Sequence, residues 1–139
     1  MRKERKRKSY VVDSHAILAY LHEDKGWQEV GRLLRYWKRK EIRAKLSWIN
    51  WGEIYYITAR NFGKQKALEV MDFIAAYPLE LEPVDFNLVE AAAELKAEYL
   101  FSYSDAFCAA TVLRYSAVLV TGDPEFQQLK DRIKIHWTV

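Results

Sequence analysis

Four acidic residues stand at positions from which their side chains could act together: Asp13, Glu53, Asp105 and Asp123. Asp13 directly follows the β-branched run 10–12, and Asp123 follows the hydrophobic run 117–120 after two further residues. If both runs are parallel strands, their carboxyl ends meet at the edge of the sheet where α/β folds bind ligands. Asp105 is expected near the start of a helix, again at the end of an element. The pattern therefore predicts that these acids face one crevice.

Each of the three aspartates also has a simpler interpretation as part of a helix terminus. Asp13 and Asp123 are of a residue type that favours the N-cap position, and Pro124 fits the first position of a helix after Asp123. Asp105 would complement the dipole of a helix that Ser104 opens. For each aspartate taken singly, the terminus role is the favoured prediction.

Glu53 has no such interpretation, because it falls in the middle of a predicted helix. Its neighbours three and four positions away form a largely apolar row: Ile49, Asn50, Tyr56 and Ile57. A carboxylate on a core-facing row is costly unless a positive charge compensates it. That charge belongs either to a buried basic partner, with Arg60 or Lys96 as candidates, or to a metal ion.

The presence of four carboxylates in one crevice favours the metal ion. Without a cation they would repel one another and raise one another's pKa. Oxygen ligands suit Mg²⁺ or Mn²⁺, and such an ion can bind a phosphate oxygen and lower the pKa of a bound water. With a divalent ion the acidic cluster is predicted to hydrolyse phosphodiester bonds, whereas without one it would repel a nucleic acid.

Alternating strands and helices must position these acids. Strands are predicted at 10–12, 42–46, 79–84, 117–120 and 133–137. Helices are predicted at 14–23, 27–40, 47–61, 64–77, 85–100 and 104–115, with a short helix after Asp123. This order implies parallel pairing through right-handed crossovers, with Pro83 marking the third strand as an edge. The predicted fold class is α/β, a three-layer α/β/α sandwich around a five-stranded, mostly parallel sheet.

The composition predicts one small globular domain with a basic tail. Half of the 139 residues are hydrophobic and 29% are charged. Residues 2–8 carry six basic residues and one acidic residue, which leaves 16 basic and 18 acidic residues, a formal charge of −2, in the remainder. We expect a disordered tail over 1–8 and a single domain over 9–139. A tail that eases the approach to RNA phosphates is the alternative.

The same composition excludes several classes of protein. No apolar run reaches the ~18 residues of a membrane span, and no apolar segment with a cleavage site follows the basic start, so neither a membrane protein nor a secreted one is expected. The single cysteine, Cys108, excludes an internal disulfide and a cysteine-based zinc site, and it fits a cytoplasmic protein. Its position among small residues predicts a buried, inert thiol.

The four acids lie in short motifs that resemble those of the PIN-domain nucleases, in particular the ribonuclease toxins of VapBC-type toxin–antitoxin pairs. The resemblance covers roughly residues 9–137, and its most specific segment is 121–126 after a hydrophobic strand. The acids follow one another at separations of 40, 52 and 18 residues, and this order supports the resemblance more than any single motif does. The matching segments are Val11-Val12-Asp13-Ser14, Asn50-Trp51-Gly52-Glu53, Ser104-Asp105-Ala106 with Ala109-Ala110, and Val120-Thr121-Gly122-Asp123-Pro124-Glu125-Phe126.

The resemblance implies a Mg²⁺- or Mn²⁺-dependent endonuclease that cleaves RNA and is neutralised by a small cognate antitoxin. It assigns the catalytic and metal-binding roles to Asp13, Glu53, Asp105 and Asp123. Thr121 matches a hydroxyl that helps to hold the site in this family. One position departs from the family pattern, because His15 stands where Asn or Ser is common. An exposed histidine in the first helical turn is expected there, with contact to the substrate as the alternative.

Other functions fit the residues less well. A receiver domain would need paired acids after the first strand and a lysine near Thr121, and a haloacid-type phosphatase would need a second Asp where His15 stands. A PIN-like binding module without activity usually lacks the acids that this chain retains. A housekeeping RNA-processing nuclease stays open, and an adjacent antitoxin gene would distinguish a toxin from it.

Two predicted helices hold more aromatic residues than a core needs. Trp27, Tyr36 and Trp37 lie in one, and the other region holds Trp48, Trp51, Tyr55, Tyr56 and Phe62. Because aromatic side chains are enriched at interfaces, we expect some of them to cover a partner surface. The expected partners are the antitoxin and a second copy of the chain in a homodimer. Core packing is the alternative for about half of these rings.

Overall fold

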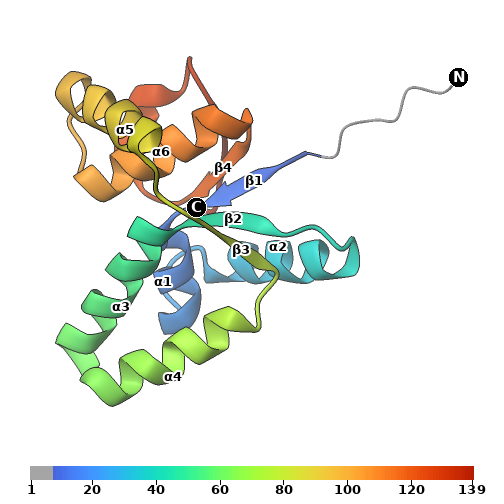
Figure 1. Ribbon diagram of the computed structural model, residues 1–139. Helices are drawn as coiled ribbons and strands as arrows, with labels where there is room; N and C mark the ends of the chain where they lie inside the picture. Colours follow the sequence, from blue (N-terminus) through green and yellow to red (C-terminus); the bar gives the residue numbers. More distant parts are fainter. Residues whose placement is uncertain (1–7) are drawn as a thin grey trace, which may run out of the picture.

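The computed structural model describes residues 8–139, which form a five-stranded sheet with helices on both faces (Figure 1). Of the tail expected over 1–8, all but the last residue lies outside the described residues. Within residues 8–139, no helix is both long and apolar enough to cross a membrane.

All five strands are parallel, in the order β3-β2-β1-β4-β5. They are β1 (Tyr10–Val12), β2 (Ala44–Ser47), β3 (Leu79–Glu82), β4 (Val118–Thr121) and β5 (Lys134–Trp137). β1 is central, with Val11 opposite Lys45 of β2 and Val12 opposite Val120 of β4. Because β1 and β4 are parallel neighbours, the residues that follow them meet at the same edge of the sheet.

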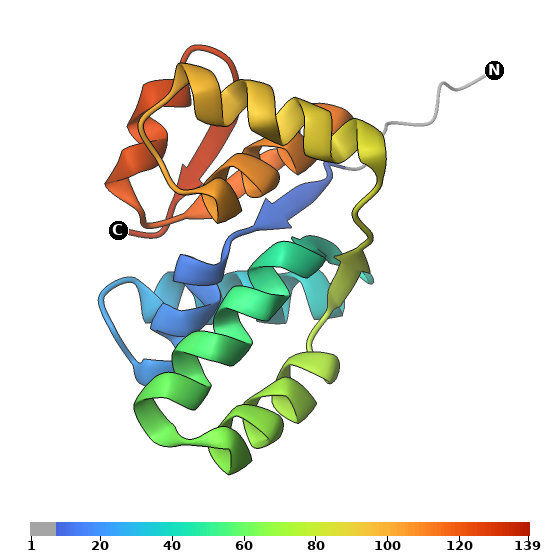
Figure 2. The ribbon, with the colours of Figure 1, turned by 60° about the vertical axis from the view of Figure 1, so that its left-hand side comes forward.

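The helices divide between the two faces of the sheet (Figures 1 and 2). One face is covered by α1 (Ser14–His22), α2 (Trp27–Arg39), α3 (Trp48–Phe62) and α4 (Lys64–Ala75). The other is covered by α5 (Phe86–Glu98), α6 (Tyr103–Tyr115) and the 3-10 helix η1 (Pro124–Leu129). Alternation along the strands supplies both cores, since the fully buried Val11 packs toward α5 and α6 and Val12 toward α1–α4. The predicted three-layer α/β/α sandwich is confirmed.

The two largest differences from the predicted strand boundaries, each of two residues, have local reasons. β2 begins at Ala44, two residues later than expected, because the backbone N–H of Ile42 donates to the Trp37 carbonyl at 2.8 Å and belongs to the end of the preceding helix. β3 ends at Glu82 because Pro83 has no N–H to continue the ladder. β3 is nonetheless an edge strand, as Pro83 predicts.

The aromatic residues divide between the core and the surface. Trp37 is fully buried, and its ring centroid lies 5.3 Å from that of Tyr10, so it is one of the rings that pack in the core. Trp48 and Phe62, by contrast, are 43% and 58% exposed on α3. Cys108 is a buried free thiol in α6, as predicted.

Candidate active site

Asp13 is buried between the end of β1 and the start of α1. Its Oδ1 accepts a hydrogen bond from the backbone N–H of Ala16 at 2.8 Å, so Asp13 is an N-cap. Its Oδ2 accepts a hydrogen bond from the hydroxyl of Thr121 at 2.5 Å. Thr121 is the last residue of β4, so this hydrogen bond joins the carboxyl ends of the two neighbouring strands.

Asp123 lies two residues beyond β4 and is held by the same hydroxyl. Its backbone N–H donates to Thr121 Oγ1 at 2.9 Å, while its side-chain Oδ1 accepts from the backbone N–H of Glu125 at 3.0 Å. Pro124 is the first residue of η1, which makes Asp123 the N-cap of that helix. The N-cap interpretation is thus correct for Asp13 and Asp123, and it leaves both carboxylates at the same edge of the sheet.

Glu53 projects from the middle of α3 and accepts a hydrogen bond at each carboxylate oxygen. The Ser14 hydroxyl donates to Oε1, and the Ser104 hydroxyl donates to Oε2 at 2.8 Å. The buried Asn50, one turn earlier, fixes this arrangement because its Nδ2 donates to the carbonyl of Ser104 at 3.2 Å. No basic side chain within residues 8–139 forms an ion pair with Glu53, and Arg60 lies instead over the Tyr56 ring. The alternative of a basic partner, with Arg60 or Lys96 as candidates, is therefore wrong, and serine hydroxyls contact the carboxylate instead.

Asp105 lies in the first turn of α6 and is only 8% exposed. The helix begins one residue before the predicted Ser104, because Ser102 is its N-cap. The Ser102 hydroxyl accepts a hydrogen bond from the backbone N–H of Asp105 at 3.1 Å. Asp105 itself is therefore not the cap, and its charge is free for another role beside the helix dipole.

Glu53, Asp105 and Asp123 line one open pocket of about 310 Å³. None of the nine residues that line this acidic pocket is Lys or Arg, and His15, at its wall, is exposed as expected. Asp13 is not part of the wall, since it is only 1% exposed, but its hydrogen bond to Thr121 holds it beside Asp123. The structure thus brings the four predicted acids together from β1, α3, α6 and the end of β4.

Burial and the neighbouring carboxylates both raise the pKa of two of the acids. Burial raises the pKa of Asp13 to about 7, and the charges of Asp105 and Asp123 add to this rise against the hydrogen bonds from Thr121 and Ala16. Burial also raises the pKa of Asp105 to about 6, with the charges of Asp123 and Glu53 contributing. The pocket therefore concentrates negative charge without a basic residue to neutralise it.

The donor atoms of these residues suit a divalent cation, but their present positions do not form a metal site. Carboxylate and hydroxyl oxygens are the ligands that Mg²⁺ and Mn²⁺ prefer. As the side chains stand, no group of three His, Cys, Asp or Glu residues in the described part of the chain has the geometry of a metal site. Ligation needs oxygens about 2.0–2.6 Å from the ion, so it requires side-chain rotation. Asp105 and Asp123 accept fewer hydrogen bonds than Glu53 and Asp13, and they can rotate at lower cost.

The serines and Asn50 are the positioning residues that sequence reasoning did not single out. Ser14 and Ser104 each stand next to a predicted acid in the chain, and Asn50 lies three positions before Glu53 on the same side of the helix. Those adjacencies were the available signal. The hydrogen bonds to Glu53 had no such signal, because Ser14 and Ser104 reach Glu53 only in the folded sheet.

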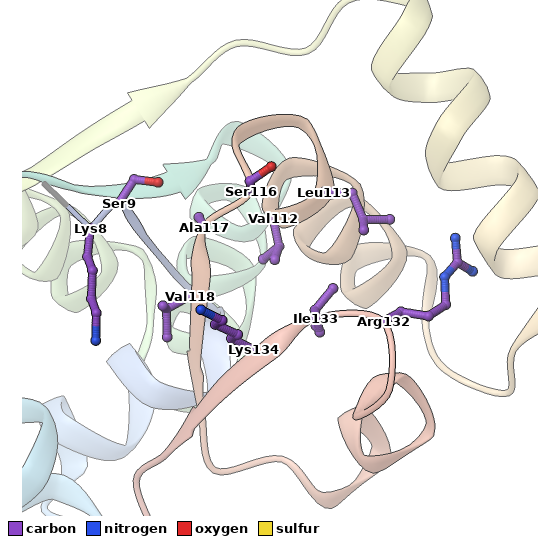
Figure 3. A pocket seen from close by; sticks show the side chains of 10 residues that line it. All are labelled: Lys8, Ser9, Val112, Leu113, Ser116, Ala117, Val118, Arg132, Ile133 and Lys134. Atoms are coloured by element: carbon purple, nitrogen blue, oxygen red, sulfur yellow. The ribbon is translucent and has the colours of Figure 1, made fainter. Parts of the chain in front are cut away.

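A second pocket, of about 350 Å³, lies at the opposite end of the strands (Figure 3). Its lining includes Lys8, Arg132 and Lys134 and no acidic residue. Lys8 precedes β1 and Lys134 begins β5, whereas the acidic pocket follows the ends of β1 and β4. The described part of the molecule therefore has a basic pocket at one end of its strands and an acidic pocket at the other end.

Solved structures of toxin–antitoxin proteins share this fold. VapBC2 from Rickettsia felis, bound to a DNA fragment from its promoter, is 17% identical, with 92% of this chain and 97% of that chain covered and a TM-score of 0.70. DNA-bound VapBC from Salmonella typhimurium is 18% identical, with 96% and 100% covered and a TM-score of 0.71. VapC20 from Mycobacterium tuberculosis, a sarcin-ricin loop cleaving toxin, is 22% identical, with 86% and 93% covered and a TM-score of 0.68.

Comparison with protein families identifies the family of the chain as well as its fold. The PIN domain matches residues 10–132, a range that contains all four acids and the hydroxyl that joins two of them. No curated protein matches the chain by sequence. Since the family match spans most of the sequence, the chain belongs to the PIN-domain family, a family of nucleases.

Proposed function

We propose that this protein is a Mg²⁺- or Mn²⁺-dependent endoribonuclease and the toxin of a VapBC-type toxin–antitoxin pair. The observation that carries the proposal is the acidic pocket, in which Glu53, Asp105 and Asp123 meet beside Asp13 without a basic residue in its lining. Such a pocket repels a phosphodiester unless a divalent cation occupies it. The cation converts the repulsion into attraction. A need for a divalent cation therefore distinguishes a nuclease site from a site that binds a neutral ligand.

Asp13, Asp105 and Asp123 would hold the metal, with Glu53 as a further ligand or as the acceptor of metal-bound water. When bound, the ion supplies charge neutralisation at the phosphate and a water of lowered pKa. The protein's own contribution is to fix the ligands in advance. The Thr121 hydroxyl orients the Asp13 carboxylate by donating to its Oδ2. The serine hydroxyls do the same for both oxygens of Glu53.

The decisive experiment is a cleavage assay on a pool of cellular RNA, followed by sequencing of the new ends. The wild-type protein is incubated with Mn²⁺ or with EDTA, beside Asp105→Asn and the matched variant Asp72→Asn, which changes an exposed acid on α4. We expect new ends at discrete positions with wild type and Asp72→Asn in Mn²⁺ only. Equal cleavage in EDTA, or wild-type cleavage by folded Asp105→Asn, would exclude this site as the catalytic centre.

The second part of the proposal is that the chain forms a homodimer and binds a small antitoxin. The exposed rings of Trp48, Tyr56 and Phe62 on α3 support it, as does the occurrence of toxin–antitoxin complexes among the structures with this fold. An amphipathic helix or extended segment of the antitoxin would cover these rings. A basic side chain from that segment could reach the acidic pocket and satisfy the carboxylates in place of the metal.

This part is tested with the product of an adjacent small gene, co-expressed with the chain. We expect a stable complex that cleaves no RNA, weakened by Trp48→Ser but not by Phe86→Ser, which changes a ring of 75% exposure on α5. Light scattering should give twice 16.4 kDa for the isolated chain. A monomer with no adjacent antitoxin gene would favour the housekeeping RNA-processing nuclease instead.

A further inference from the structure

A third pocket, of about 460 Å³, lies directly beside the acidic pocket. This flanking pocket has walls from α1, from the segment after β4 and from the last residue of the sequence, and they include His15, Leu18, Ala19, Lys25, Gly122 and Val139. His15 and Leu18 line both pockets, so the two are continuous at these side chains. An RNA strand that crosses the acidic pocket would therefore meet a second cavity beside that pocket.

Gly122 allows the His15 ring to form the boundary between the two pockets. A Cβ atom at Gly122 would lie 3.1 Å from His15 Cε1 and 2.7 Å from Thr138 Oγ1. Both distances are shorter than ordinary contacts, so a side chain at this position would push the imidazole and the Thr138 hydroxyl away from the backbone that leads into Asp123. The ring is exposed and packs beside the acidic pocket without any hydrogen bond to the four acids.

The chemistry of the flanking pocket suits a nucleobase joined to a phosphate. Its volume lies within the range of about 300–1,000 Å³ that is typical of small-ligand sites. Leu18, Ala19 and Val139 offer apolar walls to a flat ring, while Asp24 offers an acceptor for the donors at a base edge. Lys25 is the only Lys or Arg that lines either pocket, and it forms no ion pair with any described residue.

We propose that the flanking pocket binds the base of the nucleotide next to the scissile phosphate, and that His15 is a specificity-determining residue. The imidazole stacks on this base, as aromatic side chains do on unpaired RNA bases. Lys25 pairs with the adjoining phosphate and does not discriminate among bases. This inference rests on the proposed nuclease function. It adds that the enzyme selects its cleavage sites by the identity of one unpaired neighbouring base.

The test compares single-site cleavage of short RNAs that differ only in the bases flanking the cleaved bond. The variants are His15→Ala, Lys25→Gln and Lys134→Gln, the last of which removes the same charge from the basic pocket at the other end of the sheet. We expect His15→Ala to lower kcat/KM about tenfold for the preferred base and to flatten the preference, as loss of a base stack does. Lys25→Gln should raise KM about threefold or more for all sequences alike, with kcat unchanged. Lys134→Gln should stay within about twofold of wild type.

Each remaining outcome decides against the proposal in a distinguishable way. If the wild type cleaves no RNA, the nuclease function itself falls, and this inference with it. If the wild type cleaves RNA but His15→Ala keeps the base preference, the flanking pocket does not read the base. If His15→Ala melts like wild type yet cleaves no sequence, His15 acts in the chemistry and not in specificity. If Lys134→Gln raises KM as much as Lys25→Gln, the lysine effect is general electrostatics. If the variants lose affinity for the antitoxin alone, the pocket receives a protein side chain.

Discussion

Replacing Asp105 by Asn should stabilise the metal-free protein at pH 8 while it abolishes RNA cleavage. Burial and the charges of Asp123 and Glu53 raise the pKa of Asp105 from 3.8 to about 6. The unfolded chain therefore releases this proton near pH 4, whereas the folded chain keeps it until about pH 6. Stability contributed by the retained proton is lost as the pH rises through this window. The amide of Asn has no proton to lose there, so the variant should show a smaller decline than wild type, and the part that the raised pKa of Asp13 causes remains in both.

The size of the effect follows from the shift in pKa. A rise of about 2 pH units corresponds to about 3 kcal/mol at 1.36 kcal/mol per unit, which is the upper limit. Because the carboxylate faces an open pocket, solvent screens part of the repulsion, and we expect about 1–2 kcal/mol. For a domain of this size that corresponds to a rise of roughly 3–8 °C in Tm at pH 8. Below pH 4 the two proteins should melt alike.

The assay is thermal melting in EDTA from pH 3.5 to 8, with Asp72→Asn as the matched control on the exposed surface of α4. The control should follow wild type at every pH. If Asp105→Asn melts below wild type at pH 8, or shows the same decline between pH 4 and 6, then Asp105 is not held among like charges. In that event the argument for a shared metal site loses its electrostatic basis, whatever the cleavage assay gives.

Three further results are expected. Thr121→Val removes the hydrogen bond to Asp13 and should cost about 1–3 kcal/mol in urea unfolding; an unchanged midpoint would mean that this bond is not maintained in solution. Saturating Mn²⁺ should stabilise wild type, by about 2.7 kcal/mol at one hundred times Kd, but not Asp105→Asn; the absence of any shift in wild type would count against a metal site. Trp37→Ala should cost about 3–5 kcal/mol and Trp48→Ala less than about 1, and the reverse order would contradict their placement in core and surface.

The sheet could be predicted because short stretches of sequence determine its strands and helices. Each strand is a short apolar run and each helix has its own apolar row, so the alternation alone implies parallel pairing. The N-cap role of Asp13 is local as well, since its partner is Ala16. The burial of Trp37 was within reach too, because it continues a row of apolar residues at positions 30, 33 and 34.

The support of Glu53 could not be predicted in the same way. A positive charge was expected beside its carboxylate, whereas the groups that contact it are hydroxyls 39 and 51 residues away in the sequence. Serine hydroxyls also leave no trace in charge or hydropathy, unlike the basic partner that the apolar row suggested. The acids could be predicted from residue type and position together, whereas their neutral partners are marked only by their places near the acids in the sequence.

The hydrogen bond from Thr121 to Asp13 has a consequence for the synthesis of the chain. The two residues are 108 positions apart, so the first acid of the site is oriented only after nearly the whole sequence has left the ribosome. A chain that stops before β4 has Asp13 and Glu53 but lacks the strand that brings Asp123 beside them. On the proposed ribonuclease function, a partial chain without β4 is therefore expected to cleave no RNA while it is still being synthesised. Because pairing between residues this far apart closes a long loop, the sheet must assemble through β4 before the four acids can act together.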